Sequence, residues 1–80
     1  MNKHILLVMR WLKDKDSVSQ KELEKIRDGA HAANTHAAYE VFNAAIASIN
    51  GSVSHAACWV NEYFKETGED RNEYLKELNK

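Results

Sequence analysis

Near residue 60 the chain carries three residue types that could bind a metal or act as a nucleophile and a base. His55, Cys58 and Glu62 stand at i, i+3 and i+7, so a helix would present all three on one face. Such a set could ligate zinc or pair a thiolate with an imidazole base. A zinc site needs a fourth ligand and a nucleophile needs an oxyanion hole, but no second Cys/His pair or glycine-rich loop accompanies them. We therefore interpret these residues as exposed polar positions and expect no enzyme activity, metal or cofactor.

The remaining histidines give a weaker chemical signal. His31 and His36 are five residues apart, which places them roughly 140° apart on a helix, so a straight helix could not direct both at one ion. A pH-sensing role would need acidic neighbours, and Glu40 at i+4 from His36 is the one such partner in this region. We expect solvated helix positions.

Basic residues are concentrated in the first third of the chain, and Trp11 lies between them in the sequence. They are Arg10, Lys13, Lys15, Lys21, Lys25 and Arg27. Four acidic residues lie among them, and the centre of the following helix offers alanine instead of the Arg, Asn or Gln that contact bases. A solvated charged face is the favoured interpretation, which makes nucleic acid an unlikely partner; a nucleic-acid-associated regulator remains the alternative function.

Length and composition indicate one folded domain over residues 1–80. A hydrophobic fraction of 44% with 29% charged residues is typical of a globular protein. The single cysteine cannot form an internal disulfide, which fits a reducing compartment, so we expect a cytoplasmic protein. The apolar run from Ile5 to Met9 is too short to cross a bilayer, and we expect no membrane association.

The charge is unevenly distributed, although the net charge is only −1. Residues 1–27 carry seven Lys/Arg and four Asp/Glu, whereas residues 28–80 carry four and eight, giving +3 and then −4. The opposite charges could attract each other within the molecule, if the acidic part (residues 28–80) docks on the first helix. They could also do so between two copies in head-to-tail contact.

The elements that position these residues are all expected to be helices. Residues 3–13 place Ile5, Val8, Met9 and Leu12 at helical spacing, and Leu7 and Trp11 widen this apolar face. Ser19 and Glu22 form a capping box, so the second helix should begin at Gln20.

Alanine dominates the middle of the chain, with ten alanines in residues 30–57. An apolar seam of period 3.5 predicts one long central helix lined by small side chains, which would let a neighbouring helix approach closely. Gly29 could kink this helix, and Asn50 with Gly51 could end it; the alternative is a helix that continues through this point. The seam comprises Leu23, Ile26, Ala30, Ala33, Ala37, Val41 and Ala44.

Two further helices are expected toward the C-terminus. One should run to about Thr67, where Gly68 supplies the stop, and a second capping box of Asp70 and Glu73 should begin a short terminal helix. The expected fold is therefore an all-α bundle of three to four helices with a long central Ala-rich helix, and we expect two copies to associate through its seam.

The Ala seam and a surplus of aromatic residues favour a protein-interaction function. In so small a chain some large anchors must reach the surface. The candidate interaction residues are Trp11, Ala30, Ala33, Ala37, Val41, Ala44, Trp59 and Tyr63.

After the Ala-rich segment the chain carries the pattern W-V-x-x-Y-F-x-x-T-G-E, formed by Trp59, Val60, Tyr63, Phe64, Thr67, Gly68 and Glu69. With its leading amphipathic helix, its Ala-rich segment and this ending, the chain resembles small Ala-rich helical proteins encoded by tailed bacteriophages of enterobacteria. The resemblance implies a phage accessory protein of the host cytoplasm, and we expect it to bind and modulate a host protein in takeover or counter-defence.

Overall fold

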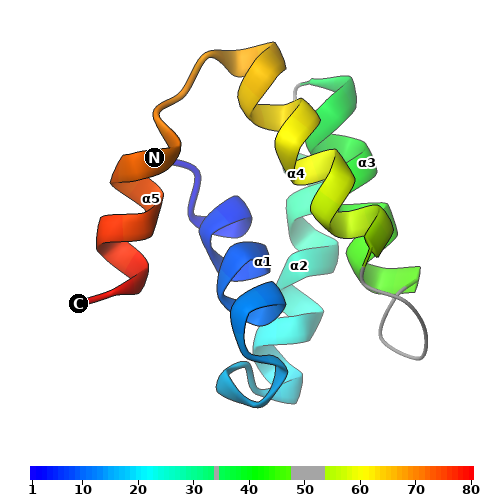
Figure 1. Cartoon of the computed structure of the whole chain (residues 1–80). Helices are drawn as coiled ribbons and strands as arrows, with labels where there is room; N and C mark the ends of the chain where they lie inside the picture. Colours follow the sequence, from blue (N-terminus) through cyan, green and yellow to red (C-terminus); the bar gives the residue numbers. More distant parts are fainter. Residues whose placement is uncertain (34, 48–53) are drawn as a thin grey trace.

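The structure, a computed structural model, describes residues 1–33, 35–47 and 54–80, apart from a few side chains within the helices. All regular structure in these residues is helical, which confirms the all-α fold class (Figure 1). The elements are α1 (Lys3–Lys13), the short 3-10 helix η1 (Lys15–Ser17), α2 (Gln20–Ala32), α3 (His36–Ala47), α4 (Ser54–Thr67) and α5 (Arg71–Leu78).

Helix α1 has the predicted bounds and the predicted apolar face. Asn2 caps it, because its side-chain oxygen accepts hydrogen bonds from the backbone N–H groups of His4 and Ile5 at 3.0 and 3.1 Å. Ile5, Val8 and Met9 are buried. The face predicted from spacing is therefore the face that enters the core.

Helix α2 begins at Gln20 through the predicted capping box. The Ser19 hydroxyl accepts from the N–H of Glu22 at 3.2 Å, and the Glu22 carboxylate accepts from the N–H of Ser19 at 3.2 Å. Two of the backbone donors left without a partner at a helix start are satisfied by this exchange.

The prediction of one long central helix is wrong, because the seam residues are divided between two helices, α2 and α3. Helix α2 ends at Ala32, and Ala33 already has an extended backbone with φ −67° and ψ 130°. The Thr35 hydroxyl accepts from the N–H of Ala38 at 3.2 Å, and the Glu66 carboxylate of α4 accepts from the N–H of Ala37 at 2.9 Å. Both acceptors satisfy helix-start donors of α3, which stabilises the break.

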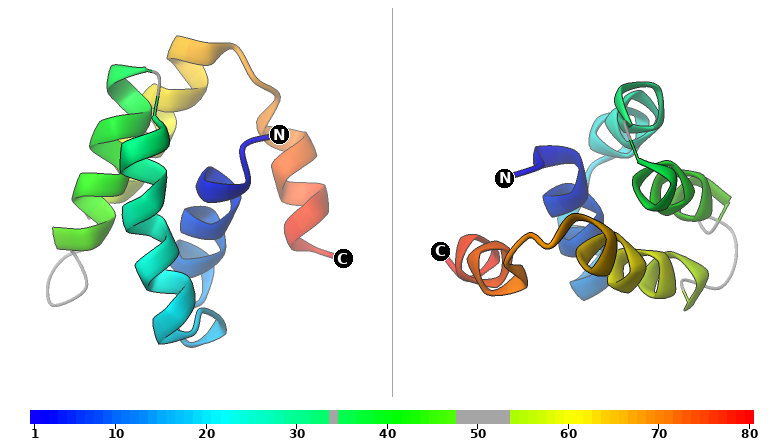
Figure 2. Two further views of the ribbon diagram at one scale, coloured as in Figure 1. Left: turned by 180° about the vertical axis from the view of Figure 1, so that it is seen from behind. Right: turned by 90° about the horizontal axis from the view of Figure 1, so that it is seen from above.

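The predicted helix end at Asn50 and Gly51 lies outside the described residues. Helices α3 and α4 flank this segment and form the most extensive helix pair of the described chain, and α2 packs against α3 on the other side. The right-hand view of Figure 2 shows α3 between α2 and α4. Small side chains on these helices, among them Ala37, Ala38, Ala45 and Ala56, are buried in the core.

Gly29 is a site of close packing, and α2 does not end there. Helix α2 continues past it to Ala32, and Gly29 is buried. A Cβ at this position would lie 2.9 Å from the Cε1 and Cζ atoms of Phe42 and 3.0 Å from the Cβ of His4. The absence of a side chain therefore lets α2 approach α1 and α3 closely.

Gly68 ends α4 as predicted. Its φ of +71° is in the left-handed region that favours glycine, and its N–H donates to the carbonyl of Phe64 at 3.0 Å. Asp70 caps α5 by accepting from the N–H of Asn72 at 2.9 Å. The predicted terminal helix is thus present, but its start differs from the predicted capping box: the Asp70 side chain accepts from the N–H of Asn72, and the N–H of Glu73 donates to the Asp70 backbone carbonyl at 3.2 Å.

Helix α5 docks on α1 through Tyr74, whose side chain is fully buried. The Tyr74 hydroxyl accepts from the N–H of Asn2 at 2.8 Å and donates to Glu69, which also accepts from the Tyr63 hydroxyl. At the far end of α1, the Lys13 ammonium donates to the Asn79 side chain at 2.8 Å. Across the described residues, no helix is long and apolar enough to cross a membrane.

Candidate functional site

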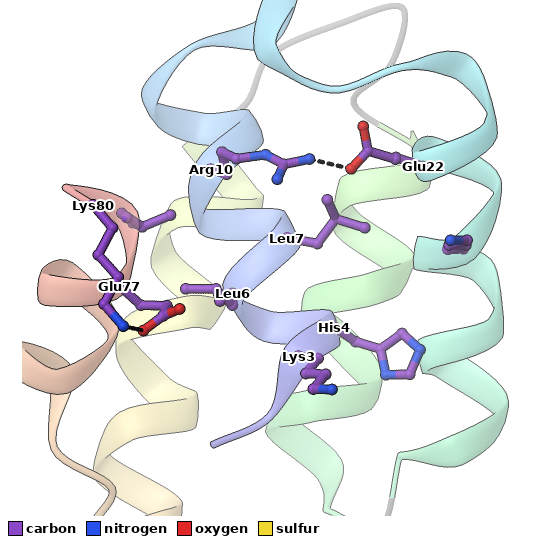
Figure 3. A pocket seen from close by; sticks show the side chains of 10 residues that line it. Lys3, His4, Leu6, Leu7, Arg10, Glu22, Glu77 and Lys80 are labelled. Atoms are coloured by element: carbon purple, nitrogen blue, oxygen red, sulfur yellow. Dashed lines mark hydrogen bonds and ion pairs between the residues drawn. The ribbon is translucent and has the colours of Figure 1, made fainter.

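A groove of about 590 Å³ runs along the outward face of α1 (Figure 3). The α1 groove has α1 as its floor, α2 as one wall and the C-terminal end of α5 as the other. Its lining consists of Lys3, His4, Leu6, Leu7 and Arg10 from α1, Glu22 and Lys25 from α2, and Glu77, Leu78 and Lys80 from the α5 end.

The centre of the groove floor is apolar. Leu6 and Leu7 pack against the edge of the core and remain partly exposed. In Figure 3, Leu6 is directed toward α5 and Leu7 toward α2, so the two side chains cover the width of the floor. Both fall outside the stripe formed by Ile5, Val8 and Met9, although Trp11, one turn beyond Leu7 on the same side of α1, is buried.

An ion pair closes one end of the groove. The Arg10 guanidinium bridges from α1 to the Glu22 carboxylate on α2. The backbone N–H of Ser19, followed by the side-chain hydrogen bond from Arg10, holds the pKa of Glu22 below its ordinary value. Glu22 therefore stays ionised near neutral pH and fixes Arg10 against α2.

On the opposite wall, the Lys80 ammonium lies 3.0 Å from the Glu77 carboxylate. These two pairs leave Lys3 and Lys25 as the lysines of the lining that have no ion-pair partner among the described residues. Both are exposed. The groove thus combines an apolar floor with a surplus of positive charge.

Among the residues that the structure describes, no ion pair joins residues 1–27 to residues 28–80. The described ion pairs are Arg10–Glu22, Glu62–Lys65 and Glu77–Lys80, and each joins residues of the same part. The acidic part does dock on α1, but Tyr74 and Asn79 make that contact through neutral groups. The basic character of the first third therefore remains at the surface.

The candidate interaction residues lie mainly inside the molecule. Trp11, Ala37, Val41 and Tyr63 are buried in the core cluster. Ala33, Ala44 and Trp59 are partly buried and pack against it, whereas the side chain of Ala30 lies outside the described part. The seam residues that the structure describes thus contact the protein's own helices.

Trp59 borders a shallow depression of about 350 Å³ beside α3. The His36 imidazole meets the Trp59 ring edge-on, with centroids 5.6 Å apart, and Glu66 lies at the same site. Because Glu66 already caps α3, the polar groups here stabilise the α3–α4 contact.

The predicted helix face of His55, Cys58 and Glu62 is exposed. Glu62 forms a 3.4 Å ion pair with Lys65. Within the part of the chain that the structure describes, no three His, Cys, Asp or Glu side chains come together in a way that could hold a metal ion.

Another cleft, of about 270 Å³, is lined by residues of α1, α4 and α5. Met9, Val60 and Leu75 contribute to its apolar lining, and Leu75 is 41% exposed. Leu78 reaches both this cleft and the α1 groove, so the C-terminal end of α5 separates the two.

The sequence-based reasoning missed the residues that form the floor and the charge of the α1 groove. Leu7 is expected to widen the buried apolar face, and nothing in the sequence pattern groups Leu6 with Lys3 and Lys25. For Leu6 and Leu7 the sequence does contain a signal of exposure. Around the axis of α1 both fall about 100° or more from the centre of the apolar face formed by Ile5, Val8, Met9 and Leu12. The facing positions of α2 and α5 carry no such signal.

No protein-family model, no curated protein and no solved structure matches this chain, so the groove itself is the basis for its functional interpretation.

Proposed function

We propose that this chain is a non-enzymatic phage accessory protein that binds and modulates a host protein in the host cytoplasm, and that the α1 groove is its binding surface. The phage assignment is supported by the resemblance of the aromatic ending and the Ala-rich segment to small phage proteins. The binding role is supported by the geometry of the groove.

The observation that carries the binding role is the pair of partly exposed leucines on the outward face of α1. Apolar side chains at the centre of a concave surface, with charged residues around them, are the arrangement that protein partners desolvate on binding. Leu6 and Leu7 have this placement, with Lys3 and Lys25 beside them. In the core, by contrast, Trp11 and Tyr63 already have partners within the molecule.

A nucleic-acid-associated regulator is the second candidate, because the same two lysines could contact phosphates. Phosphate contacts need hydrogen-bond donors along the surface, whereas the centre of this groove is leucine. The apolar floor favours a protein partner. Self-association also stays a prediction. Because Ala37 and Val41 are buried within the molecule, the seam is not the surface on which we expect a second copy to bind.

Affinity capture from host lysate tests the function when it compares a groove variant with a control variant. The groove variant carries Leu6→Gln and Leu7→Gln, and the control carries Leu75→Gln, which changes an exposed leucine outside the groove. Circular dichroism melts establish that each variant is folded. We expect the wild type and the control to retain a host protein in a stoichiometric complex. The groove variant should lose this protein.

Equal capture by a folded groove variant would remove the groove from the proposed function. Capture of a nucleic acid instead, lost steeply with added salt, would support the regulator alternative.

A further inference from the structure

Resting on the proposed function, we infer that the α1 groove binds an acidic amphipathic α-helix of the partner, with its apolar stripe on Leu6 and Leu7 and its carboxylates beside Lys3 and Lys25. The inference concerns the chemistry of the occupant. It is carried by the shape, the apolar floor and the charge of the groove, taken in turn below.

The shape of the groove suits one face of a helix. The floor follows α1, whose 11 residues span about 16 Å at the rise of an α-helix. Figure 3 shows the α2 and α5 walls on either side of this floor. A volume of about 590 Å³ accommodates several side chains and not a whole helix. The occupant therefore lies over the groove and inserts one row of side chains.

The floor selects apolar residues at helical spacing. Leu6 and Leu7 point to opposite walls, so a row of side chains entering between α2 and α5 contacts both. Residues at i, i+3 or i+4, and i+7 of a partner helix form such a row. Insertion removes the partly exposed leucine surface from water, and this burial makes the favourable contribution to the free energy of binding.

The positive charge of the groove favours a partner helix with acidic residues on either side of its apolar row. Arg10 and Lys80 are neutralised by Glu22 and Glu77, whereas Lys3 and Lys25 have no ion-pair partner among the described residues of the chain. Lys25 lies one turn beyond Glu22 on α2, so it lines the wall beside the leucines. A carboxylate on either flank of the partner's apolar row would meet one of these lysines, and a basic flank would be repelled.

Synthetic peptides of roughly 14 residues test the inference by fluorescence anisotropy against the whole chain. One peptide has leucines at i, i+4 and i+7 with glutamates on the flanks. A second replaces the glutamates with lysines, and a third replaces the leucines with serines. We expect the first peptide to bind about tenfold tighter than either of the others.

The protein variants are matched in charge. Lys3→Glu with Lys25→Glu changes the groove, and Lys15→Glu with Lys21→Glu changes two exposed lysines outside it by the same amount. All four positions are exposed, so both variants should fold. The groove variant is expected to lose the acidic peptide and prefer the basic one, and the control is expected to bind like the wild type.

Equal affinity for the acidic and basic peptides, or for the leucine and serine peptides, would overturn the inference. So would tighter binding of a short DNA duplex in the same buffer, or a self-associated protein that the acidic peptide dissociates, because the occupant would then be a nucleic acid or a second copy. If the peptides fail but a host protein is still lost from the Leu6/Leu7 variant, the inference fails and the proposed function stands. If the acidic peptide binds but no host protein depends on the groove leucines, the proposed function fails instead.

Discussion

Replacement of Gly29 by alanine tests whether close packing of α2 determines the arrangement of the helices. The added Cβ would lie 2.9 Å from two ring atoms of Phe42 and 3.0 Å from the Cβ of His4, closer than carbon atoms approach without strain. Phe42 is 1% exposed and its ring meets the His4 ring edge-on at 6.1 Å, so the ring has little room to move.

Two opposing terms set the size of the effect. Overpacking in a filled core costs about 1 to 3 kcal/mol, and collision with residues of two different helices places this site in the upper part of that range. The gain in helix propensity from Gly to Ala is about 1 kcal/mol. We expect Gly29→Ala to lower the free energy of unfolding by about 1 to 2 kcal/mol, which for a chain of this size lowers the melting temperature by about 5 to 15 °C.

Thermal and urea unfolding followed by circular dichroism measures this change. Asp28→Ala is the matched control, since it adds a better helix former at the exposed neighbouring position and should stay within about 0.5 kcal/mol of the wild type. In a Phe42→Leu background the two ring atoms are absent, so the penalty of Gly29→Ala should fall by about 1 kcal/mol. A higher melting temperature for Gly29→Ala, or an identical penalty in both backgrounds, would refute the packing argument.

Three further substitutions address the helix ends and the contact between α5 and α1. Ser19→Ala should cost about 1 kcal/mol in urea unfolding because it breaks the capping box, and an unchanged midpoint would contradict this role. Gly68→Ala should cost about 1 kcal/mol because φ is +71°, and Gly68→Asn should cost less; equal effects of the two would argue against backbone strain. Burial works to raise the pKa of Glu69, but hydrogen bonds from Tyr63 and Tyr74 outweigh it and hold the pKa below the ordinary 4.5. The stability that this carboxylate contributes is therefore complete above pH 4.5 and lost as the pH falls through the lower pKa of the folded state, so Glu69→Gln should flatten the acid side of a stability–pH curve, and a parallel curve would exclude that contribution.

The elements whose boundaries depend on local chemistry were predicted correctly from the sequence. The apolar spacing of Ile5, Val8 and Met9 sets the bounds and buried face of α1, and the Ser19–Glu22 box sets the start of α2. Gly68 similarly ends α4. Each of these signals acts over one or two helical turns, so the residues involved are neighbours in the sequence.

The break between α2 and α3 could not be predicted in the same way. Alanine on both sides of it favours a continuous helix, and Thr35 is only a weak local signal for a new start. The second acceptor at this start is Glu66, which is 29 residues away in the sequence and reaches Ala37 only after α4 has packed. A tertiary contact therefore decides where the helices divide.

The α1 groove was missed for a related reason. Its leucines could be found on the outward face of α1, but whether another helix covers that face depends on where α2 and α5 lie. Lys3 and Lys25 come together in the groove because α2 packs beside α1. Neither fact follows from a pattern within one helix.

The buried alanines impose an unusual pattern of mutational tolerance on this protein. Ala37, Ala38, Ala45 and Ala56 are almost fully buried in the core, so almost any other residue at these positions adds volume to a closely packed interior. In most small domains the costliest changes shorten large side chains. Here enlargement of the smallest ones should be equally harmful, and sequence divergence over time would be confined largely to the solvent-facing sides of the same helices.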